Sequence, residues 1–361
     1  MSALKLGIVG AGGMASYHFD GFTRAGAEVV AMADKDIARA REFGAGRGIS
    51  RFYTGLGEML DGSPEIGAVS VITPNKFHKP LVIEALERGR HVYCEKPPAL
   101  NAAETEAMKE AAEKAGKVLM FDLNNRARPE AKAIMYYIQN GKVGEINSAQ
   151  ATWIRRNGIP GFGGWFTNKA IAGGGPVLDL PHMFDLALYF MGYPEPDWVL
   201  AAVYDDFMGN PAFKGPWGIP DLAGGVTDVE SACHAFITFK TGQCLMIRSS
   251  WAEMNEREVV SVTFQGRRSG GKIERLFDID GLDGTSIDNC AIFTEEDGRQ
   301  VDYLIKAEKD ETMGRVAQAA NFVDAITGKE APLNTPAQAV IMMKLVDAMY
   351  ESAAARRPVK L

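Results

Sequence analysis

The stretch Leu6–Ala15, LGIVGAGGMA, decides the first half of the fold. Its β-type residues run directly into a glycine-rich turn of the form Gly-x-Gly-x-x-Ala, and helical spacing follows. In such a turn Gly10 permits the tight bend, Gly12 lets backbone N–H groups approach a pyrophosphate, and Ala15 lets the helix pack closely on the sheet. The stretch therefore predicts a strand, a helix, and between them a dinucleotide-binding turn that includes Gly10, Gly12, Gly13 and Met14.

Outward from this stretch, the first 123 residues alternate short β-type runs with helix-length amphipathic runs. This alternation is typical of a doubly wound parallel sheet. The expected strands are Leu4–Val9, Glu28–Ala33, Ala68–Ile72, His91–Cys94 and Val118–Leu123. The expected helices are Met14–Ala25, Ile37–Phe43, Lys79–Arg88 and Ala102–Ala115. Asn101, followed by Glu104, resembles an N-cap for the last of these helices.

From about residue 145 the β-type runs follow one another and predict an open, mainly antiparallel sheet with helices on one face. The runs are Asn147–Ile154, Trp198–Tyr204, Val229–Phe239, Gln243–Trp251, Val259–Phe264, Lys272–Phe277, Asn289–Thr294 and Val301–Ile305. Glycine-containing turns such as 240–242 and 296–298 favour hairpins between paired runs. Helices are expected at Leu178–Met191, Val316–Ile326 and Ala337–Ala353.

The chain has 361 residues, of which 46% are hydrophobic and 24% charged, as in an ordinary water-soluble globular protein. This length favours two domains. We expect a cofactor domain at residues 1–123 and a domain for substrate binding and oligomerisation at residues 124–361, with the final helix able to pack back on the first domain.

Charge and composition exclude several classes of function. With 39 basic and 46 acidic residues the net charge is −7, and the basic residues form no stripe, so nucleic-acid binding is not expected. No apolar run is long enough to cross a membrane, and the stretch after Lys5 is too rich in glycine for a signal peptide. The four cysteines lie far apart, without metal or redox spacing, which favours free thiols in a reducing cytoplasm and no metal site.

Asp34 ends the second expected strand, where a carboxylate accepts hydrogen bonds from the adenosine ribose of a dinucleotide. This favours NAD as cofactor. Lys35 beside it would tolerate a 2′-phosphate, so NADP stays open.

Two polar segments follow neighbouring expected strands, at the carboxyl ends where parallel sheets bind ligands. One is ITPNKFH, residues 72–78, and the other is VYCEKPP, residues 92–98. Together with the glycine turn they resemble the Gfo/Idh/MocA family of oxidoreductases. The resemblance implies a Rossmann domain, a catalytic lysine at Lys96, and a cofactor pocket that includes Thr73, Pro74, Asn75, His78, Glu95 and Lys96.

Chemistry supports the assignment of Lys96, because an ammonium group near the reacting oxygen stabilises a developing alkoxide. Glu95 has three open roles: it holds Lys96, it binds the ribose, or it only caps a strand end. His78 has a comparable alternative as a cap at a helix start.

The richest segment of the second half is GGGPVLDLPHMFD, residues 173–185, which resembles the second signature of the same family. By resemblance Asp179 and His182 are catalytic and contact the substrate, and both would share a face in the first turn of one helix. His182, with an ordinary pKa near 6.5, would exchange the proton of a sugar hydroxyl. Open alternatives are a helix N-cap at Asp179 and a packed or ion-paired histidine at His182. The spacing between the two is one residue shorter than usual in the family.

Three further residues complete the expected pocket. Asn124 and Trp165 match cofactor-pocket positions of the family. Arg155 ends a strand beside a glycine-rich loop, where it would bind a polyol or an acidic sugar, or would be a solvated edge charge. The loops at residues 157–175 and 205–225 have the composition of ordered binding loops.

The resemblance implies an NAD(P)-dependent dehydrogenase acting on a secondary alcohol or ketone of a sugar, polyol or derivative. Two alternatives are a glycosidase-like enzyme that oxidises its substrate transiently with bound NAD, and a non-catalytic NAD(P)-binding regulator. The wide open sheet predicts a homodimer or homotetramer formed through its outer face.

Overall fold

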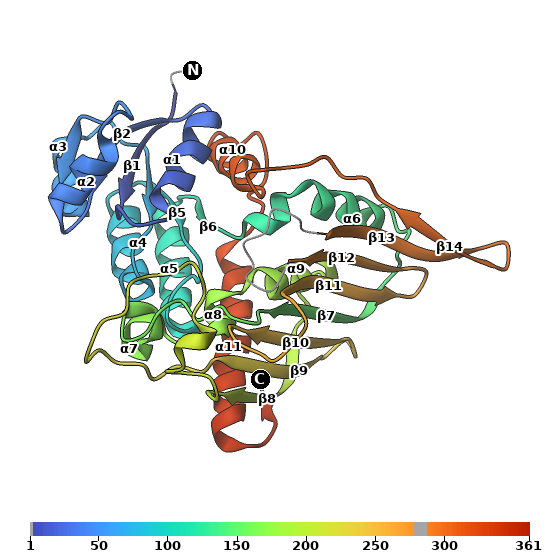
Figure 1. The fold of residues 1–361 in the computed structure, drawn as a ribbon. Coiled ribbons are helices and arrows are strands. Elements are labelled where there is room, and N and C mark those ends of the chain that lie inside the picture. The colour runs from blue at the N-terminus through green and yellow to red at the C-terminus, as the bar shows by residue number, and fades with distance from the viewer. Residues whose placement is uncertain (1–2, 278–286) are drawn as a thin grey trace. The chain divides into compact units, whose positions relative to one another are not determined.

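The computed structural model describes residues 3–277 and 287–361, which form two compact units. The first unit comprises Met1–Ala127 and Glu311–Val340, and the second Arg128–Asp310 and Ile341–Leu361. Figure 1 shows the elements of both. The domain boundary that we expect after residue 123 stays a prediction.

The first unit contains the predicted doubly wound parallel sheet. Its strands are β1 (Lys5–Val9), β2 (Glu28–Ala33), β3 (Arg51–Tyr53), β4 (Ala68–Val71), β5 (His91–Cys94) and β6 (Leu119–Phe121). They lie in the order β3-β2-β1-β4-β5-β6, and every pair is parallel. Successive strands are added toward one edge from β1 to β3 and toward the other edge from β4 to β6. Sheets of this kind bind ligands where this order changes, here between β1 and β4, at the carboxyl ends of the strands.

The α-helices that lie wholly within the first unit are α1 (Ala15–Arg24), α2 (Ile37–Gly44), α3 (Leu56–Gly62), α4 (His78–Glu87), α5 (Ala102–Ala115) and α10 (Arg315–Ile326). The predicted cap of α5 is confirmed, because the side chain of Asn101 accepts a hydrogen bond from the N–H of Glu104. Helix α10 packs on α1, where the rings of Phe22 and Phe322 meet edge to face at 5.9 Å. Neither β3 nor α3 follows from the sequence, since β3 is short and only half-buried.

The second unit contains the predicted open sheet. Its strands are β7 (Ile146–Ile154), β8 (Pro196–Tyr204), β9 (Ala232–Phe239), β10 (Cys244–Ser250), β11 (Val259–Gly266), β12 (Gly270–Leu276), β13 (Ile287–Glu296), β14 (Arg299–Leu304) and β15 (Val359–Lys360). The order is β14-β13-β12-β11-β7-β10-β9-β8-β15, and all pairs are antiparallel except β7 with β10. Both predicted hairpin turns are present, with positive φ at Gly242 and Gly298.

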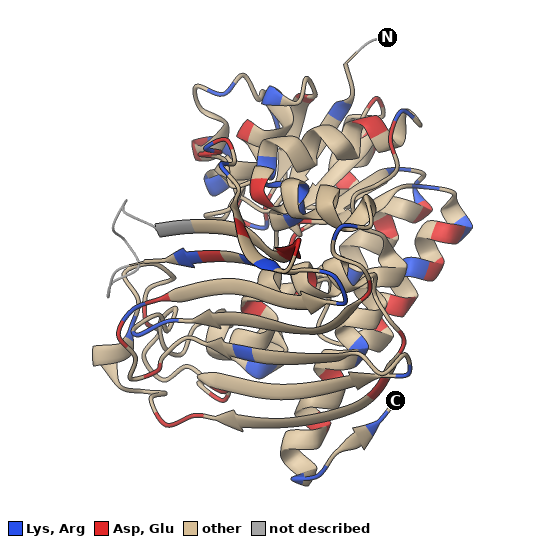
Figure 2. Cartoon of the chain, turned by 90° about the vertical axis from the view of Figure 1, so that its right-hand side faces the viewer, with Lys and Arg blue, Asp and Glu red and all other residues tan. Residues whose placement is uncertain are grey.

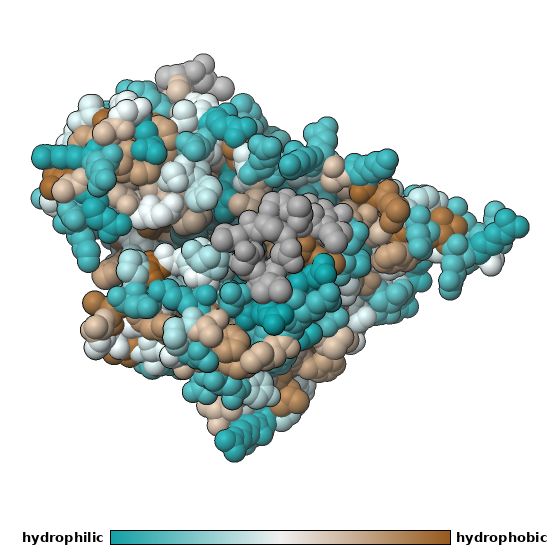
Figure 3. Space-filling view, viewed as in Figure 1, coloured by the Kyte–Doolittle hydropathy of each residue, from teal (hydrophilic) through white to brown (hydrophobic). Residues whose placement is uncertain are grey.

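Helices cover one face of this sheet, as expected. Helix α6 (Pro129–Gln139) packs on β12 and β13, α8 (Pro176–Asp179) on β9 and β10, and α9 (His182–Met191) on β7 and β11. The opposite face is open, and Figure 2 shows that β8 to β11 carry few charged residues. The end of the β13–β14 hairpin is hydrophilic (Figure 3), with Glu295, Glu296 and Arg299 exposed, and charge of this kind protects a sheet edge from pairing with other chains.

The single helix predicted over Leu178–Met191 is wrong. Helix α8 ends at Asp179 and α9 begins at His182, because Pro181 has no N–H to continue a helix and forces Leu180 out of helical geometry, with φ −109° and ψ 45°. The α-helices α6, α7 (Lys169–Ala172) and α11 (Pro336–Ala355) also have residues in this part of the structure. Of these, only α11 was expected.

Residues 157–175 and 205–225 fold against each other in the second unit. Backbone hydrogen bonds connect them, including Ile159 to Phe213, Ile219 to Pro160 and Leu222 to Phe162. Among the residues that the structure describes, no helix combines the length and the apolar character needed to span a bilayer.

Candidate active site

The glycine turn after β1 leaves open space at the start of α1. Gly10 has φ +107°, and a Cβ there would lie 2.4 Å from the carbonyl oxygen of Ile72, so only glycine fits. A Cβ at Gly12 or Gly13 would meet nothing within 4 Å. The N-cap residue Met14 makes no capping side-chain hydrogen bond. Open space at a helix N-terminus without a side-chain cap suits a phosphate group.

The carboxylate of Asp34 lies beside this turn in a fixed orientation. Its two oxygens accept hydrogen bonds from the N–H groups of Ala11 at 2.8 Å and Asp36 at 2.9 Å. A carboxylate oxygen has capacity for a second donor, so Asp34 remains able to bind ribose hydroxyls. Lys35 is exposed next to it.

The segment after β4 is tied to the segment after β5 by His78. The His78 ring nitrogens lie 2.8 Å from the carbonyl oxygen of Thr73 and 2.9 Å from that of Pro97. Only the imidazolium form can donate to both carbonyls, whereas burial opposes that form and lowers the pKa of His78. The Thr73 hydroxyl is buried without a hydrogen-bond partner among the described residues, as a group that binds a ligand would be. Asn75, two residues later, is also buried.

Lys96 follows β5 and is half-buried. Its backbone N–H donates to Glu95 Oε2 at 2.9 Å, and the Lys96–Pro97 peptide bond is cis. This contact fits both a Glu95 that holds Lys96 and a Glu95 that caps the end of β5, so the role of Glu95 stays a prediction. Asn124, also in this unit, is buried and donates its amide to the carbonyl oxygen of Met313 at 2.6 Å.

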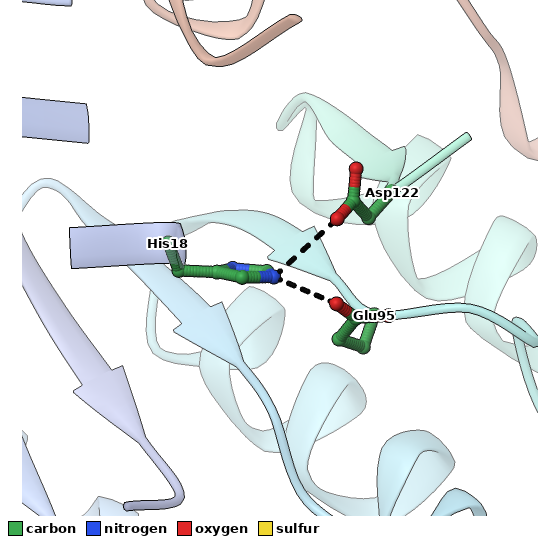
Figure 4. Close-up of side chains that lie close together, drawn as sticks. All are labelled: His18, Glu95 and Asp122. Atoms are coloured by element: carbon green, nitrogen blue, oxygen red, sulfur yellow. Dashed lines mark hydrogen bonds and ion pairs between the residues drawn. The ribbon is translucent and has the colours of Figure 1, made fainter. Parts of the chain in front are cut away.

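A buried polar cluster that includes Glu95, the residue before Lys96, was not expected from the sequence. His18 Nε2 lies 2.9 Å from Glu95 Oε1 and 3.5 Å from Asp122 Oδ2 (Figure 4). Its Nδ1 lies 2.8 Å from the hydroxyl of Ser70. One signal was available: His18 is three residues after Ala15 and four before Phe22, on the buried face of α1, and a buried histidine needs polar partners.

This cluster is strongly charged. Burial by itself lowers the pKa of His18, but the hydrogen bonds and charges of Asp122 and Glu95 outweigh it and raise the pKa to about 9. Contact with His18 likewise holds the pKa of Asp122 well below its ordinary value, against the effect of burial. The three side chains each offer an atom that a metal ion could bind, within 4.8 Å of one another, but these atoms already pair with each other.

In the second unit, Asp179 and His182 lie on different helices. Asp179 is the last residue of α8, so it is not a helix N-cap, and its Oδ2 accepts a hydrogen bond from Trp251 Nε1 at 2.9 Å. His182 is the first residue of α9, and its ring lies 5.8 Å from that of Trp153. The two therefore do not share the first turn of one helix, because the break at Pro181 separates them.

The glycine run before Asp179 is packed against other side chains. A Cβ at Gly174 would lie 1.9 Å from the hydroxyl of Tyr350, and one at Gly175 would lie 2.2 Å from the carbonyl oxygen of Glu230. Tyr350 and the N–H of Gly175 both donate to Glu230 Oε1, at 2.7 and 2.9 Å.

Arg155 is held among aromatic rings. Its guanidinium lies 3.8 Å from the ring centre of Trp217 and 5.3 Å from that of Trp153. Its Nε pairs with Glu258 at 3.2 Å, and its Nη1 is buried without a hydrogen-bond partner. Arg155 is therefore not a solvated edge charge. Trp165, in the adjoining loop, stacks on Phe166 at 3.8 Å.

Comparison with known proteins agrees with this geometry. The model of an oxidoreductase family with an NAD-binding Rossmann fold matches residues 4–123, and that of the C-terminal α/β domain of an oxidoreductase family matches residues 136–361. D-Glucoside 3-dehydrogenase of Escherichia coli K12 is 32% identical over 360 residues, which cover 98% of this chain and 96% of that protein.

Levoglucosan dehydrogenase of Pseudarthrobacter phenanthrenivorans is 30% identical over 208 residues, covering 53% of this chain and 52% of that protein. A solved structure of levoglucosan dehydrogenase in complex with NADH and levoglucosan superimposes with a TM-score of 0.82 over 99% of each chain. Its sequence identity is 22%, so this likeness shows the shared fold.

Proposed function

Because this chain belongs to the Gfo/Idh/MocA family of NAD-binding oxidoreductases, we propose that it oxidises a secondary alcohol of a sugar, glycoside or polyol, or reduces the corresponding ketone. The observation that carries the proposal is the placement of Lys96 in the first unit. It follows β5 at the same edge of the sheet as the open glycine turn that follows β1. A polarising ammonium group and a phosphate-binding turn at one sheet edge suit a nicotinamide-dependent reaction.

The residues present fit NAD. The open space at Gly12 and Gly13, together with the helix N-terminus at Met14, would hold the diphosphate. Asp34 would bind the adenosine ribose, and its carboxylate would repel the 2′-phosphate that NADP carries there. A bound cofactor would supply the hydride chemistry, with NAD as the acceptor during oxidation of the substrate and NADH as the donor during reduction. The remaining residues proposed for the cofactor pocket are Gly10, Thr73, Pro74, Asn75, His78, Glu95, Lys96, Asn124 and Trp165.

Two side chains carry the proton and the charge of the substrate oxygen. His182 takes the hydroxyl proton during oxidation and returns it during reduction. The Lys96 ammonium stabilises the alkoxide as it forms and polarises the ketone in the reverse direction. Asp179, whose orientation is fixed by Trp251, accepts a hydrogen bond from a substrate hydroxyl. The proposal keeps residues 1–123 as the cofactor domain and 124–361 as the domain for substrate binding and oligomerisation, with Asn124 and Trp165 of the latter range contributing to the cofactor pocket.

Arg155 distinguishes the two substrate classes left open by the sequence. Glu258 pairs with its guanidinium and offsets the positive charge that a sugar acid would need. A buried guanidinium N–H without an acceptor instead favours a neutral hydroxyl or ring oxygen as partner, since an unmade hydrogen bond costs about 1–3 kcal/mol. The favoured substrate is therefore a neutral sugar, glycoside or polyol.

NADH absorbance tests the proposal directly. The purified chain is incubated with NAD and a panel of neutral glycosides, free sugars, polyols and uronates, and we expect net NADH formation with a neutral member. Lys96→Ala should lower turnover by at least about 100-fold while NAD still binds, whereas Lys114→Ala, at an exposed lysine of α5, should change nothing. Glycoside cleavage without net NADH would instead support transient oxidation, and cofactor binding without turnover would support a regulator.

The open face of the second sheet supports a homodimer or homotetramer. Trp198, Leu200, Phe236 and Met246 are each 42–49% exposed on this face, and the first three line an apolar groove with Thr238 and Pro358. Apolar surface of this kind normally contacts a partner, and a second copy of this chain would cover it symmetrically. Light scattering should show an oligomer that Phe236→Glu dissociates. A monomer at micromolar concentration would contradict this.

The thiols support a reducing cytoplasm as the location. Cys94, Cys233, Cys244 and Cys290 are all free, and burial raises the pKa of Cys94 and Cys233. Buried protonated thiols of this kind are inert structural residues. Labelling of the denatured protein, taken directly from cells, should find four free thiols.

A further inference from the structure

We infer that His18 is a positioning residue for Lys96: its imidazolium holds the carboxylate of Glu95, and Glu95 holds the backbone of Lys96. The inference rests on the proposed role of Lys96. His18 itself lies on α1 and need touch neither substrate nor cofactor, so it adds a residue that the family resemblance did not supply.

His18, on α1, connects three neighbouring strands of the parallel sheet. It contacts Ser70 of β4, Glu95 directly after β5, and Asp122 directly after β6. Figure 4 shows its Nε2 directed between the two carboxylates. His18, Glu95 and Asp122 are all at least 95% buried, so no solvent competes for these contacts.

Both carboxylate oxygens of Glu95 have a partner. Oε1 lies 2.9 Å from His18 Nε2, while Oε2 accepts the N–H of Lys96 at 2.9 Å. Glu95 cannot turn without breaking both contacts, so His18 fixes the carboxylate that fixes the Lys96 peptide. On the other flank, the carbonyl oxygen of Pro97 faces His78. The chain thus has one contact at the N–H of Lys96 and another at the carbonyl oxygen of the residue that follows it.

Protonation of His18 balances the charges of the cluster. Glu95 and Asp122 are two carboxylates, Tyr93 donates its hydroxyl to Asp122 at 2.9 Å, and the positive charge of Arg315 on α10 lowers the pKa of Asp122. With His18 protonated, two positive charges face two negative charges. With His18 neutral, a net negative charge stays buried in the cluster, and a buried charge without a partner is strongly unfavourable.

The pKa of His18 agrees with the protonated form. It is raised to about 9 by Asp122 and Glu95, against the effect of burial. The groups that face His18 from the surrounding elements are Ser70, Tyr93, Glu95 and Asp122, with Arg315 acting at longer range. Only the carboxylates carry negative charge at neutral pH, so they account for the cation.

The first experiment uses the unaltered protein. With the chain labelled in its histidine rings, ¹⁵N NMR should show His18 doubly protonated at neutral pH and titrating near pH 9. A neutral ring at neutral pH, or one equivalent of tightly bound metal found by elemental analysis, would overturn the inference. This measurement needs no substrate, so it remains decisive even if no sugar is oxidised and the proposed function fails.

The second experiment separates positioning from packing. His18→Gln keeps a hydrogen-bond donor but removes the charge, and we expect kcat to fall by roughly 10- to 100-fold while the Kd for NAD changes by less than about threefold. In a double-mutant cycle, His18→Gln should lower kcat far less when Glu95→Gln is already present, because the side chain that His18 holds is then uncharged. Additive losses, or equal losses in kcat and NAD affinity, would show a purely structural role.

The matched control is His91→Gln. His91 begins β5 in the same sheet, and its Nδ1 accepts a hydrogen bond from the N–H of Val118 at 3.0 Å. We expect its kcat to match that of the unaltered chain. If His91→Gln lowers kcat as much as His18→Gln, any histidine of the sheet has the same effect and the inference is wrong.

Discussion

Two glycine-rich segments precede helices in this chain, and their surroundings differ. At Gly12 and Gly13 an added Cβ would meet nothing within 4 Å. At Gly174 and Gly175 the same atom would meet Tyr350 and Glu230 at 1.9 and 2.2 Å. The first segment leaves space for a group from outside the chain, whereas the second is filled by the protein itself. A glycine motif can therefore record a ligand or a packing contact, and only its neighbours tell which.

The largest expected effect is the loss of stability in Gly175→Ala. The new Cβ would lie 2.2 Å from a backbone oxygen of Glu230, which cannot move without disturbing the start of β9. We expect the free energy of unfolding to fall by about 3 kcal/mol, at the upper end for an overpacked core. Urea denaturation measures it, with and without NAD. An unchanged midpoint would mean that the two segments do not differ as described.

Gly12→Ala is expected to show the opposite pattern. Stability should stay within ~0.5 kcal/mol, as for other substitutions that meet no neighbour. The Kd for NAD should rise by roughly 10- to 30-fold, equivalent to about 1.4–2 kcal/mol, since the methyl group enters the space left for the diphosphate. Calorimetric titration measures the Kd. Equal losses of stability and affinity would remove the contrast between the segments.

The sequence predicted the elements whose periodicity is strong. Glu28–Ala33, His91–Cys94 and Ala102–Ala115 have the predicted bounds, because apolar alternation and a cap define them locally. It did not predict β3, with three half-buried residues, or the break in the helix at Leu180. In the second case the apolar pattern continued through Pro181, and the loss of one backbone donor had more effect than the pattern.

The candidate site was predictable where a motif is contiguous, as at Gly10–Met14 and around Lys96. The cluster of His18 with Glu95 and Asp122 was not, since its members are 77 and 104 residues apart in sequence (95 − 18 and 122 − 18) and meet only through the sheet order. Tyr350 and Glu230, which both contact the glycine run, are 120 residues apart in sequence, and their contact was not predicted for the same reason.

Tyr350→Phe tests the packing of the second segment more gently. It removes the hydroxyl that donates to Glu230 at 2.7 Å and keeps the ring, so a buried carboxylate loses one of its two observed donors. We expect a loss of about 1–2 kcal/mol in the free energy of unfolding, with no change in NAD affinity. Tyr136→Phe, at a tyrosine that is 64% exposed, is the control and should change neither.

The smallest effect is expected for Glu230→Gln, and it depends on pH. Burial raises the pKa of Glu230, against the opposing hydrogen bond from Tyr350. The pKa of Glu230 in the folded protein lies above its ordinary value of 4.5. The stability that Glu230 contributes is therefore fully present below pH 4.5 and is lost as the pH rises through the folded-state pKa. Glutamine keeps an oxygen for Tyr350 and Gly175 without the charge. Urea denaturation should therefore show the variant more stable at neutral pH by less than about 1 kcal/mol, with the difference vanishing in acid. A variant less stable at neutral pH would show that the charge on Glu230 holds the second glycine segment, so that this segment, like the first, is organised around an anion.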